Sequence, residues 1–360
     1  MLVYITYFIF IAILAIQYEF TPFKNNYLLF SIIILLSLLA GLRDPSVSKD
    51  YLNYQYVFNN MNEITSDGYY YLLAFEPGFV GIVVVFRKLF EVNYGVAIML
   101  FYALASLSLK VFTINRFSIN PYLTLLYYFS YFFLLHEMTQ IRIALASGIF
   151  LISLIPFLKG KWLTFIGLVI LATCFHYSAI FFLLILIFDT NKLNRNLYIS
   201  ILILSLILGF LKLPVLDLLG NFDASGFSTK LNTYIELSEN GSVVVNIFNS
   251  LNILNILCCF YLIFAVKKED FIKDKRLNLF LKCNILSIFL FSLLSGAPAF
   301  AMRFNQLFGI AQIFLFTYLL KYLPFKRFNI FILVLVAGFF FYVMEIYGGL
   351  LEPYKIINIK

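Results

Sequence analysis

The chain has 360 residues, of which 62% are hydrophobic and only 12% are charged, whereas charged residues make up about a quarter of a soluble domain. This composition excludes a soluble globular protein. Successive apolar runs long enough for a helix to cross about 30 Å of hydrocarbon predict an all-α polytopic membrane protein. The formal net charge of +8 comes from Lys and Arg in short loops, which is typical of cytoplasmic loops and does not indicate nucleic-acid binding.

Apolar runs follow one another along the whole chain and predict about eleven to thirteen transmembrane helices in a single transmembrane domain, residues 1–360. Polar residues lie near the ends of the runs. The four cysteines lie within them, without metal-ligand spacing, and are expected to be free thiols. The predicted spans are 3–17, 27–42, 75–90, 95–114, 122–135, 143–158, 163–175, 178–188, 197–211, 245–266, 277–294, 304–320 and 328–344.

Basic residues orient the chain. From Arg116 onward, Lys and Arg gather in alternate connections, which places those connections in the cytoplasm and the others outside. The same parity puts residues 43–50 in the cytoplasm if 75–90 crosses the membrane. Because Glu76-Pro77-Gly78 and Arg87-Lys88 lie near its two ends, we expect 75–90 to be a tilted or re-entrant segment that does not cross. The first loop, 43–74, then lies outside.

That first loop is rich in functional groups. Asp50 is a good N-cap, and the residues Tyr51, Tyr54, Phe58 and Met61 recur at helical spacing, which predicts an amphipathic helix lying at the membrane interface. Its tyrosines are consistent with an aromatic belt and equally with sugar binding through their rings.

The acids of the same loop offer two interpretations. Asp44 and Asp50 are candidates for a general base on a sugar hydroxyl, whereas Asp44 is also placed to pair with Arg43.

Two arginines lie at the outer ends of later spans, where the predicted helices begin. Arg142 precedes the small residues 144–148, and Arg303 stands in a similar position. A cation at a helix N-terminus is unfavourable unless an anion is also present, so the pair predicts a clamp for phosphate or diphosphate. Interfacial snorkelling is the alternative.

The two histidines, His136 and His176, flank these polar regions. A structural role is possible for both. For His176, the position on the predicted outer face equally fits phosphate binding or proton transfer. Metal-binding motifs do not occur, and no metal or other cofactor is expected. The long outer loop 213–244 contains Leu231, Tyr234, Ile235 and Ser238 at helical spacing, which predicts a lid helix.

Taken together, these motifs resemble the EpsG-like and Wzy-type polymerases of bacterial surface polysaccharides. The matching segments are Gly41 to Asp44 (Gly-Leu-Arg-Asp), Asp50 to Tyr54 (Asp-Tyr-x-x-Tyr), Glu76 before a span, Arg142 to Ala146 (Arg-x-x-Leu-Ala), His176 to Ser178 (His-Tyr-Ser) and the late Arg303. The resemblance covers most of the chain, although each motif is weak alone.

The resemblance implies a metal-independent glycosyltransferase of the integral-membrane GT-C type, in the bacterial inner membrane, with its active site facing the periplasm or exterior. Its substrate would be an undecaprenyl-diphosphate-linked oligosaccharide, and its partners a chain-length regulator, a flippase and membrane lipid. The catalytic candidates are Asp44, Asp50, Glu76 and His176; the substrate-binding candidates are Arg43, Tyr51, Tyr54, Arg142, Tyr177, Tyr234 and Arg303.

Three other functions remain open. An O-antigen ligase has nearly the same requirements. A flippase or other transporter predicts internal repeats and polar residues at mid-membrane, whereas the sequence places polar groups at span ends. A membrane O-acyltransferase would need a histidine among basic cytoplasmic residues, and His176 lies on the opposite predicted face.

Overall fold

The structure is a computed structural model that describes residues 1–23, 26–61, 75–90, 92–212 and 245–358. Within these ranges the protein is all-α, apart from one isolated antiparallel bridge between Arg43 and Ile356. The contacts divide the chain into unit 1, Met1–Leu183 with Leu319–Lys360, and unit 2, Leu184–Tyr318. Each unit is described by itself.

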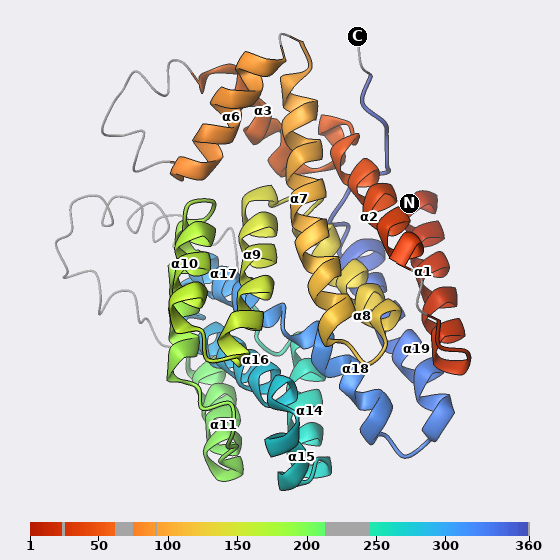
Figure 1. Ribbon diagram of the computed structural model, residues 1–360, viewed down its shortest axis with the longest axis vertical. Helices are drawn as coiled ribbons and strands as arrows, with labels where there is room; N and C mark the ends of the chain where they lie inside the picture. Colours follow the sequence, from red (N-terminus) through yellow and green to blue (C-terminus); the bar gives the residue numbers. More distant parts are fainter. Residues whose placement is uncertain (24–25, 62–74, 91, 213–244, 359–360) are drawn as a thin grey trace, which may run out of the picture. The chain divides into compact units, whose positions relative to one another are not determined.

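Unit 1 is built around α7, the longest described helix, which packs against α2 and α9 (Figure 1). Small residues let these helices approach closely: a Cβ on Gly41 of α2 would lie 2.8 Å from the Leu100 Cα of α7. The elements are α1 (Leu2–Phe20), α2 (Asn26–Gly41), η1 (Pro45–Val47), α3 (Lys49–Asn59), α6 (Pro77–Leu89), α7 (Tyr94–Phe117), α8 (Pro121–Tyr127), η2 (Tyr128–Phe133), α9 (Ile141–Leu158), α10 (Trp162–Thr173), the first part of η3 (Tyr177–Ile187), the end of α18 (Gln312–Tyr322), η4 (Lys326–Phe328), α19 (Asn329–Phe341) and η5 (Tyr342–Tyr347).

The amphipathic helix predicted in the first loop is α3, and its predicted apolar face is buried. Tyr54 and Phe58 pack against Phe79 of α6, with ring centroids 6.2 Å apart in both pairs. The predicted N-cap was wrong: Ser48 precedes the helix, and Asp50 lies in its first turn, where a carboxylate favours the positive end of the helix dipole.

The helix α6 is short. Its 13 residues cover about 20 Å at 1.5 Å per residue, less than the thickness of the hydrocarbon layer. Figure 1 shows α3 and α6 together at the upper end of unit 1, tilted away from the direction of α7. The expectation that 75–90 does not cross the membrane stays a prediction.

A C-terminal strap, residues 352–357, holds the loop that follows α2. The strap and the loop exchange three backbone hydrogen bonds: from Asp44 N to Lys355 O at 2.8 Å, from Glu352 N to Val47 O at 3.0 Å, and from Ile357 N to Leu42 O at 2.9 Å. Segments near the two ends of the sequence thus fix each other.

Unit 2 is organised around α16, which packs against α11, α14 and α17. Its elements are α11 (Arg195–Leu211), α14 (Ser250–Ala265), α15 (Lys268–Lys273), α16 (Lys275–Leu293), α17 (Pro298–Gly309) and the first part of α18 (Gln312–Tyr322). The run 304–320, predicted as one span, is not one continuous helix, because α17 ends at Gly309 and α18 begins at Gln312. The run 178–188, expected as an α-helical span, is 3₁₀-helical in η3.

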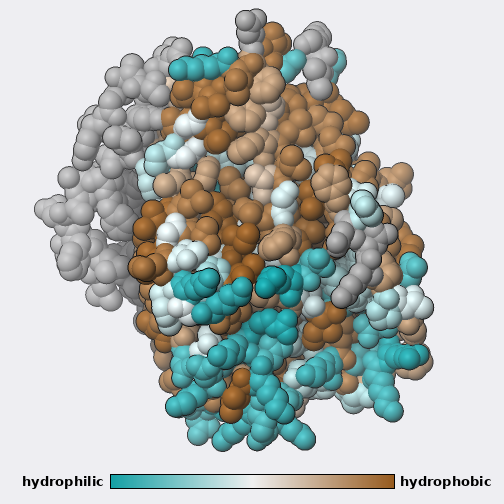
Figure 2. Space-filling view, in the orientation of Figure 1, coloured by the Kyte–Doolittle hydropathy of each residue, from teal (hydrophilic) through white to brown (hydrophobic). Residues whose placement is uncertain are grey.

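Five described helices are long and apolar enough to cross a membrane: Leu2–Phe20, Tyr94–Phe117, Ile141–Leu158, Lys275–Leu293 and Lys326–Tyr347. Five shorter apolar helices accompany them. Figure 2 shows apolar surface along the upper part of α7, whereas hydrophilic side chains gather around α15. The chain is an all-α polytopic membrane protein.

Candidate functional site

Glu76 is the centre of a polar cluster in unit 1, which we call the Glu76 cluster (Glu76, Arg142, His176 and Tyr177). Glu76 precedes α6 without capping it through its side chain. Its carboxylate instead pairs with Arg142 Nη1 at 2.5 Å and His176 Nδ1 at 3.3 Å, and accepts the Tyr177 backbone N–H at 3.4 Å. One carboxylate therefore ties together the starts of α6, α9 and η3.

Backbone contacts hold the two loops of this cluster in register. The Gly78 N–H donates to the Cys174 carbonyl at 2.8 Å, and the Tyr177 hydroxyl donates to the Phe75 carbonyl at 3.0 Å. A Cβ on Gly78 would lie 2.7 Å from the Cys174 oxygen. Glycine is therefore required here by the close approach of two backbones.

Arg142 is the second residue of α9, where the helix dipole opposes a cation. Glu76 supplies the compensating anion. The guanidinium also lies 5.3 Å from the ring centroid of Phe79 and 5.9 Å from that of Phe75, and such contacts stabilise a cation. The Arg142 side chain nevertheless keeps 26% of its surface exposed, so the cluster is open to an incoming anion.

The surroundings of Glu76 determine its charge. Burial would raise the pKa of Glu76, but the hydrogen bond from His176 and the positive charge of Arg142 together lower it to about 2. Glu76 is therefore ionised at neutral pH and is a weak base. Its chemistry suits holding a cation and orienting an imidazole.

The pKa of Asp50 is shifted in the opposite direction from that of Glu76. Burial raises the pKa of Asp50, against the opposing charges of Arg142 and Arg43. These interactions place the carboxyl of α3 within reach of the charges of both arginines. Burial also raises the pKa of Tyr54, and the charge of Arg142 opposes it. Asp50 and Tyr54 therefore border the Glu76 cluster.

Asp44 and Arg43 have different local partners. Asp44 Oδ1 accepts the Ser46 N–H at 2.9 Å and the Ser46 hydroxyl at 2.6 Å, which lowers the pKa of Asp44. Arg43 is fully buried beneath the Tyr51 ring, with 5.1 Å from its Cζ to the ring centroid, and donates to the Ala40 carbonyl. Burial lowers the pKa of Arg43 to about 10, so it stays cationic.

A second ionic cluster lies deeper in unit 1 and escaped sequence reasoning. Lys110 Nζ in α7 lies 2.6 Å from Glu137 Oε1, and neither side chain is exposed. The same oxygen accepts the Ser106 hydroxyl at 2.7 Å, while Lys110 donates to the Tyr128 hydroxyl at 3.2 Å. This Lys110–Glu137 pair corrects the expectation that polar groups stay at span ends. A lone lysine inside an apolar run was the available signal.

His136 adjoins the Lys110–Glu137 pair. Burial, with a contribution from the charge of Lys110, lowers the pKa of His136 well below its usual range. Its Nδ1 lies 3.4 Å from the Ser147 hydroxyl. His136 is therefore neutral, and its structural role stays a prediction.

The remaining predicted site residues lie elsewhere. Arg303 is half-buried in α17 of unit 2. Tyr234, with the predicted lid helix and the rest of 213–244, lies outside the described residues, as do residues 62–74 of the first loop. Unit 1 alone thus brings Asp50, Tyr54, Glu76, Arg142, His176 and Tyr177 together from separate stretches of sequence.

Comparisons with known proteins give a family assignment. Neither a curated protein nor a solved structure is significantly similar to this chain. The model of the EpsG family matches residues 26–356, which includes every residue of the Glu76 cluster and nearly the whole chain. The protein therefore belongs to the EpsG family.

Proposed function

We propose that this protein is a polysaccharide polymerase that transfers a growing glycan from undecaprenyl diphosphate to a hydroxyl of the next lipid-linked repeat unit, on the outer face of the bacterial inner membrane. The observation that carries the proposal is the Glu76 carboxylate joining Arg142 and His176 in a partly open cluster. Such a cluster supplies a cation for the leaving group and an oriented imidazole.

The leaving diphosphate needs positive charge. In the proposed reaction the bond between the sugar C1 and the phosphate oxygen breaks, and its electron pair stays on the diphosphate. The exposed part of Arg142 is available to phosphate oxygens, and a guanidinium bonds them bidentately. The second phosphate contact that the sequence predicts, at Arg303, stays a prediction.

The acceptor hydroxyl needs a base for its proton. Of the three acids predicted for this role, Glu76 and Asp44 have lowered pKa values, whereas burial raises the pKa of Asp50. A general base works best when its pKa approaches the working pH. We therefore assign proton abstraction to Asp50 and the formation of the new C1–O bond to the hydroxyl oxygen that it activates.

We assign to His176 the role of holding a proton near the leaving diphosphate. Its Nδ1 faces the Glu76 carboxylate. A carboxylate held at Nδ1 fixes the tautomer and orientation of a histidine, whose Nε2 then carries out the chemistry. Glu76 thus acts through His176 and Arg142 and is a positioning residue.

The tyrosines divide by exposure. Tyr51 and Tyr54 are buried, whereas Tyr177 keeps 38% of its surface exposed. A sugar ring stacks on an accessible aromatic face. Tyr177 is therefore the tyrosine that we assign to sugar contact, and Tyr51 and Tyr54 support Arg43 and Phe79 from within.

The test is glycan analysis on gels in a strain that lacks this protein, complemented with wild type, Arg142→Ala or His176→Ala. Wild type should restore a ladder of repeat-unit lengths, whereas the variants should leave single repeat units at normal protein levels. Arg116→Ala, in the last turn of α7, is the matched control. A ladder in the uncomplemented strain, with no second polymerase present, would overturn the proposal.

The same gels separate the alternative functions. Loss of a polymerase leaves single repeat units on the final acceptor, whereas loss of a ligase leaves long glycan on the lipid carrier. Loss of a flippase leaves lipid-linked units inside the cell. Metal independence is also part of the proposal, and transfer in membrane vesicles should continue when EDTA is present.

A further inference from the structure

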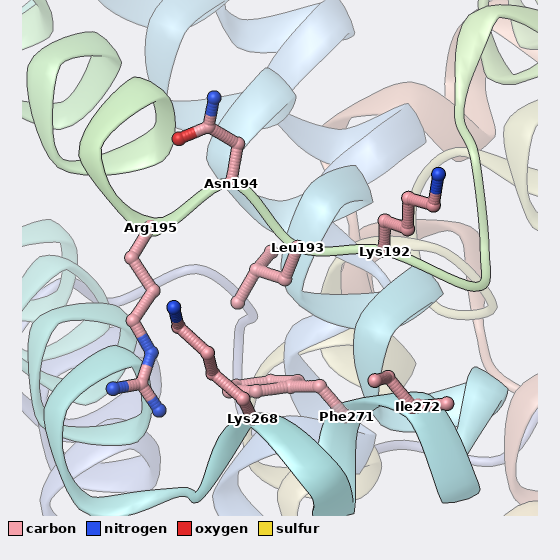
Figure 3. Close-up of a pocket in the computed structure, with 7 residues that line it drawn as sticks. All are labelled: Lys192, Leu193, Asn194, Arg195, Lys268, Phe271 and Ile272. Carbon is pink, nitrogen blue, oxygen red and sulfur yellow. The ribbon is translucent and has the colours of Figure 1, made fainter.

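A cavity at one end of unit 2 has no part in the proposed reaction. Its volume is about 310 Å³, and it lies between the loop before α11 and the short helix α15. Figure 3 shows Arg195 of α11 and Lys268 of α15 on one side of the cavity, and Lys192 at the other end of the loop. The lining residues are Lys192, Leu193, Asn194, Arg195, Lys268, Phe271 and Ile272.

The loop that forms the cavity is held in place. Lys282 of α16 is buried and donates to the carbonyls of Lys192, at 2.6 Å, and of Asp189. Asn278 donates to the Thr190 carbonyl at 2.9 Å, and Arg195 donates to the carbonyl of Val266. The cationic side chains therefore stand on a fixed backbone, which lowers the cost of ordering a bound ligand.

The charge around the cavity is one-sided. Three of its lining residues are cationic and none is acidic. The acids nearby have other positions: Asp189 accepts the Asn191 N–H at 2.8 Å, and Glu269 and Asp270 do not line the cavity. Cations that share a cavity without an anion repel one another, and a phosphate would relieve that repulsion.

Apolar surface accompanies the positive charge. Leu193, Phe271 and Ile272 line the cavity, and while Phe271 is buried there, Ile272 is 57% exposed. Free phosphate would leave this surface in water. We propose that the cavity binds the phosphate of an anionic glycerophospholipid, with the acyl chains lying along these apolar side chains.

The proposal is tested by binding of a short-chain phosphatidylglycerol to the purified full chain in neutral detergent, measured through thermal stabilisation. Wild type should be stabilised, and Lys192→Gln/Lys268→Gln should bind about tenfold more weakly. The matched control, Lys267→Gln/Lys273→Gln, removes the same charge from the same end of unit 2 without touching the cavity. It should change affinity by less than about threefold.

Three results would overturn the lipid site. They are absence of stabilisation of wild type, equal weakening of both double variants, and equal stabilisation by phosphatidylcholine. Inorganic phosphate separates the two sources of a phosphate group: if it stabilises wild type as well as the lipid does, the cavity binds phosphate and the lipid assignment fails. Because the readout is binding, none of these results depends on the polymerase proposal.

Discussion

Two ion pairs in the described part of unit 1, Arg142–Glu76 and Lys110–Glu137, have similar chemistry and different access. The Arg142–Glu76 pair is 2.5 Å long and keeps 26% of the arginine side chain exposed, whereas the Lys110–Glu137 pair is 2.6 Å long and fully buried. The first pair shares its carboxylate with His176 and the Tyr177 backbone, and the second with Ser106. Access decides which pair can exchange its partner for a substrate anion.

The difference also separates function from stability. A buried pair contributes little beyond the cost of desolvating both charges, but removing one partner leaves the other charge buried and unpaired. The Ser106 hydroxyl also lies 2.8 Å from the Ala144 carbonyl, so Ser106 links the Lys110–Glu137 pair to the first turns of α9, which carries Arg142. The Lys110–Glu137 pair therefore helps to hold α9, the helix that carries Arg142 of the Arg142–Glu76 pair.

The largest effect is expected from Lys110→Met, which leaves Glu137 buried without its cation. The variant should lose about 3–5 kcal/mol of folding free energy, seen as a lower unfolding temperature in detergent and less protein in membranes. The double variant Lys110→Met/Glu137→Gln should recover most of this loss. If it is no more stable than the single variant, the ion pair is not the cause.

Asp50→Asn should reduce glycan transfer by at least about a hundredfold, because it removes the assigned general base. Stability should stay the same or rise, since burial of the charged carboxylate is unfavourable and the neutral amide avoids it. Asp44→Asn is the matched control, because its carboxylate faces Ser46. Full transfer by Asp50→Asn would remove Asp50 from the mechanism.

Arg142→Lys tests the open pair. Lysine keeps the positive charge but lacks the planar guanidinium that binds phosphate oxygens bidentately. Glycan transfer in membrane vesicles should therefore fall about tenfold to a hundredfold. The unfolding temperature should change far less than in Lys110→Met, because the site is partly exposed. A stability loss as large as that of Lys110→Met would show that both pairs are structural.

Gly78→Ala tests the contact that positions Glu76. The new Cβ would meet the Cys174 oxygen at 2.7 Å and force the two loops apart, at a cost of about 1–3 kcal/mol and with reduced transfer. Gly81→Ala on the same helix, where a Cβ meets nothing within 4 Å, should be neutral or stabilising. Equal behaviour of the two variants in thermal unfolding would contradict the close approach.

The smallest effect is the pH dependence of stability near neutrality. The pKa of Glu76 is lowered from 4.5 to about 2, so its contribution to folding is fully present above pH 4.5 and is lost as pH falls toward 2. Between pH 7 and pH 5 stability should change little through Glu76, while transfer should be lost on acidification at a higher pH than an ordinary aspartate would give, because burial raises the pKa of Asp50. Rates and unfolding temperatures measured over this range check both statements.

Local patterns predicted much of unit 1. The spacing of Tyr51, Tyr54 and Phe58 predicted α3 because a buried helical face has its own period. The break in the predicted span 304–320 was not predictable in this way. A Cβ on Gly309 would lie 3.0 Å from the Ser287 hydroxyl of α16, and such packing between helices leaves no periodic trace in the sequence.

The sequence predicted which residues belong to the candidate site, but only partly how they contact one another. Residue types and motif order identified Glu76, Arg142 and His176 as site candidates, but the shared carboxylate depends on how α6 and α9 meet in space. Lys110 and Glu137 are 27 positions apart, and neither belongs to a motif. Their pairing becomes apparent only once α7 and the turn before α9 are side by side.

The C-terminal strap has a consequence for biosynthesis. Its bonds to residues 42–47 form between segments that leave the ribosome about 300 residues apart, at roughly 5–20 residues per second. The loop that carries Arg43 and leads into α3 therefore lacks its hydrogen bonds to the strap until unit 2 has been synthesised. A chain that stops before the strap would lack this closure, so the loop that carries Arg43 is fixed only after unit 2 has been synthesised.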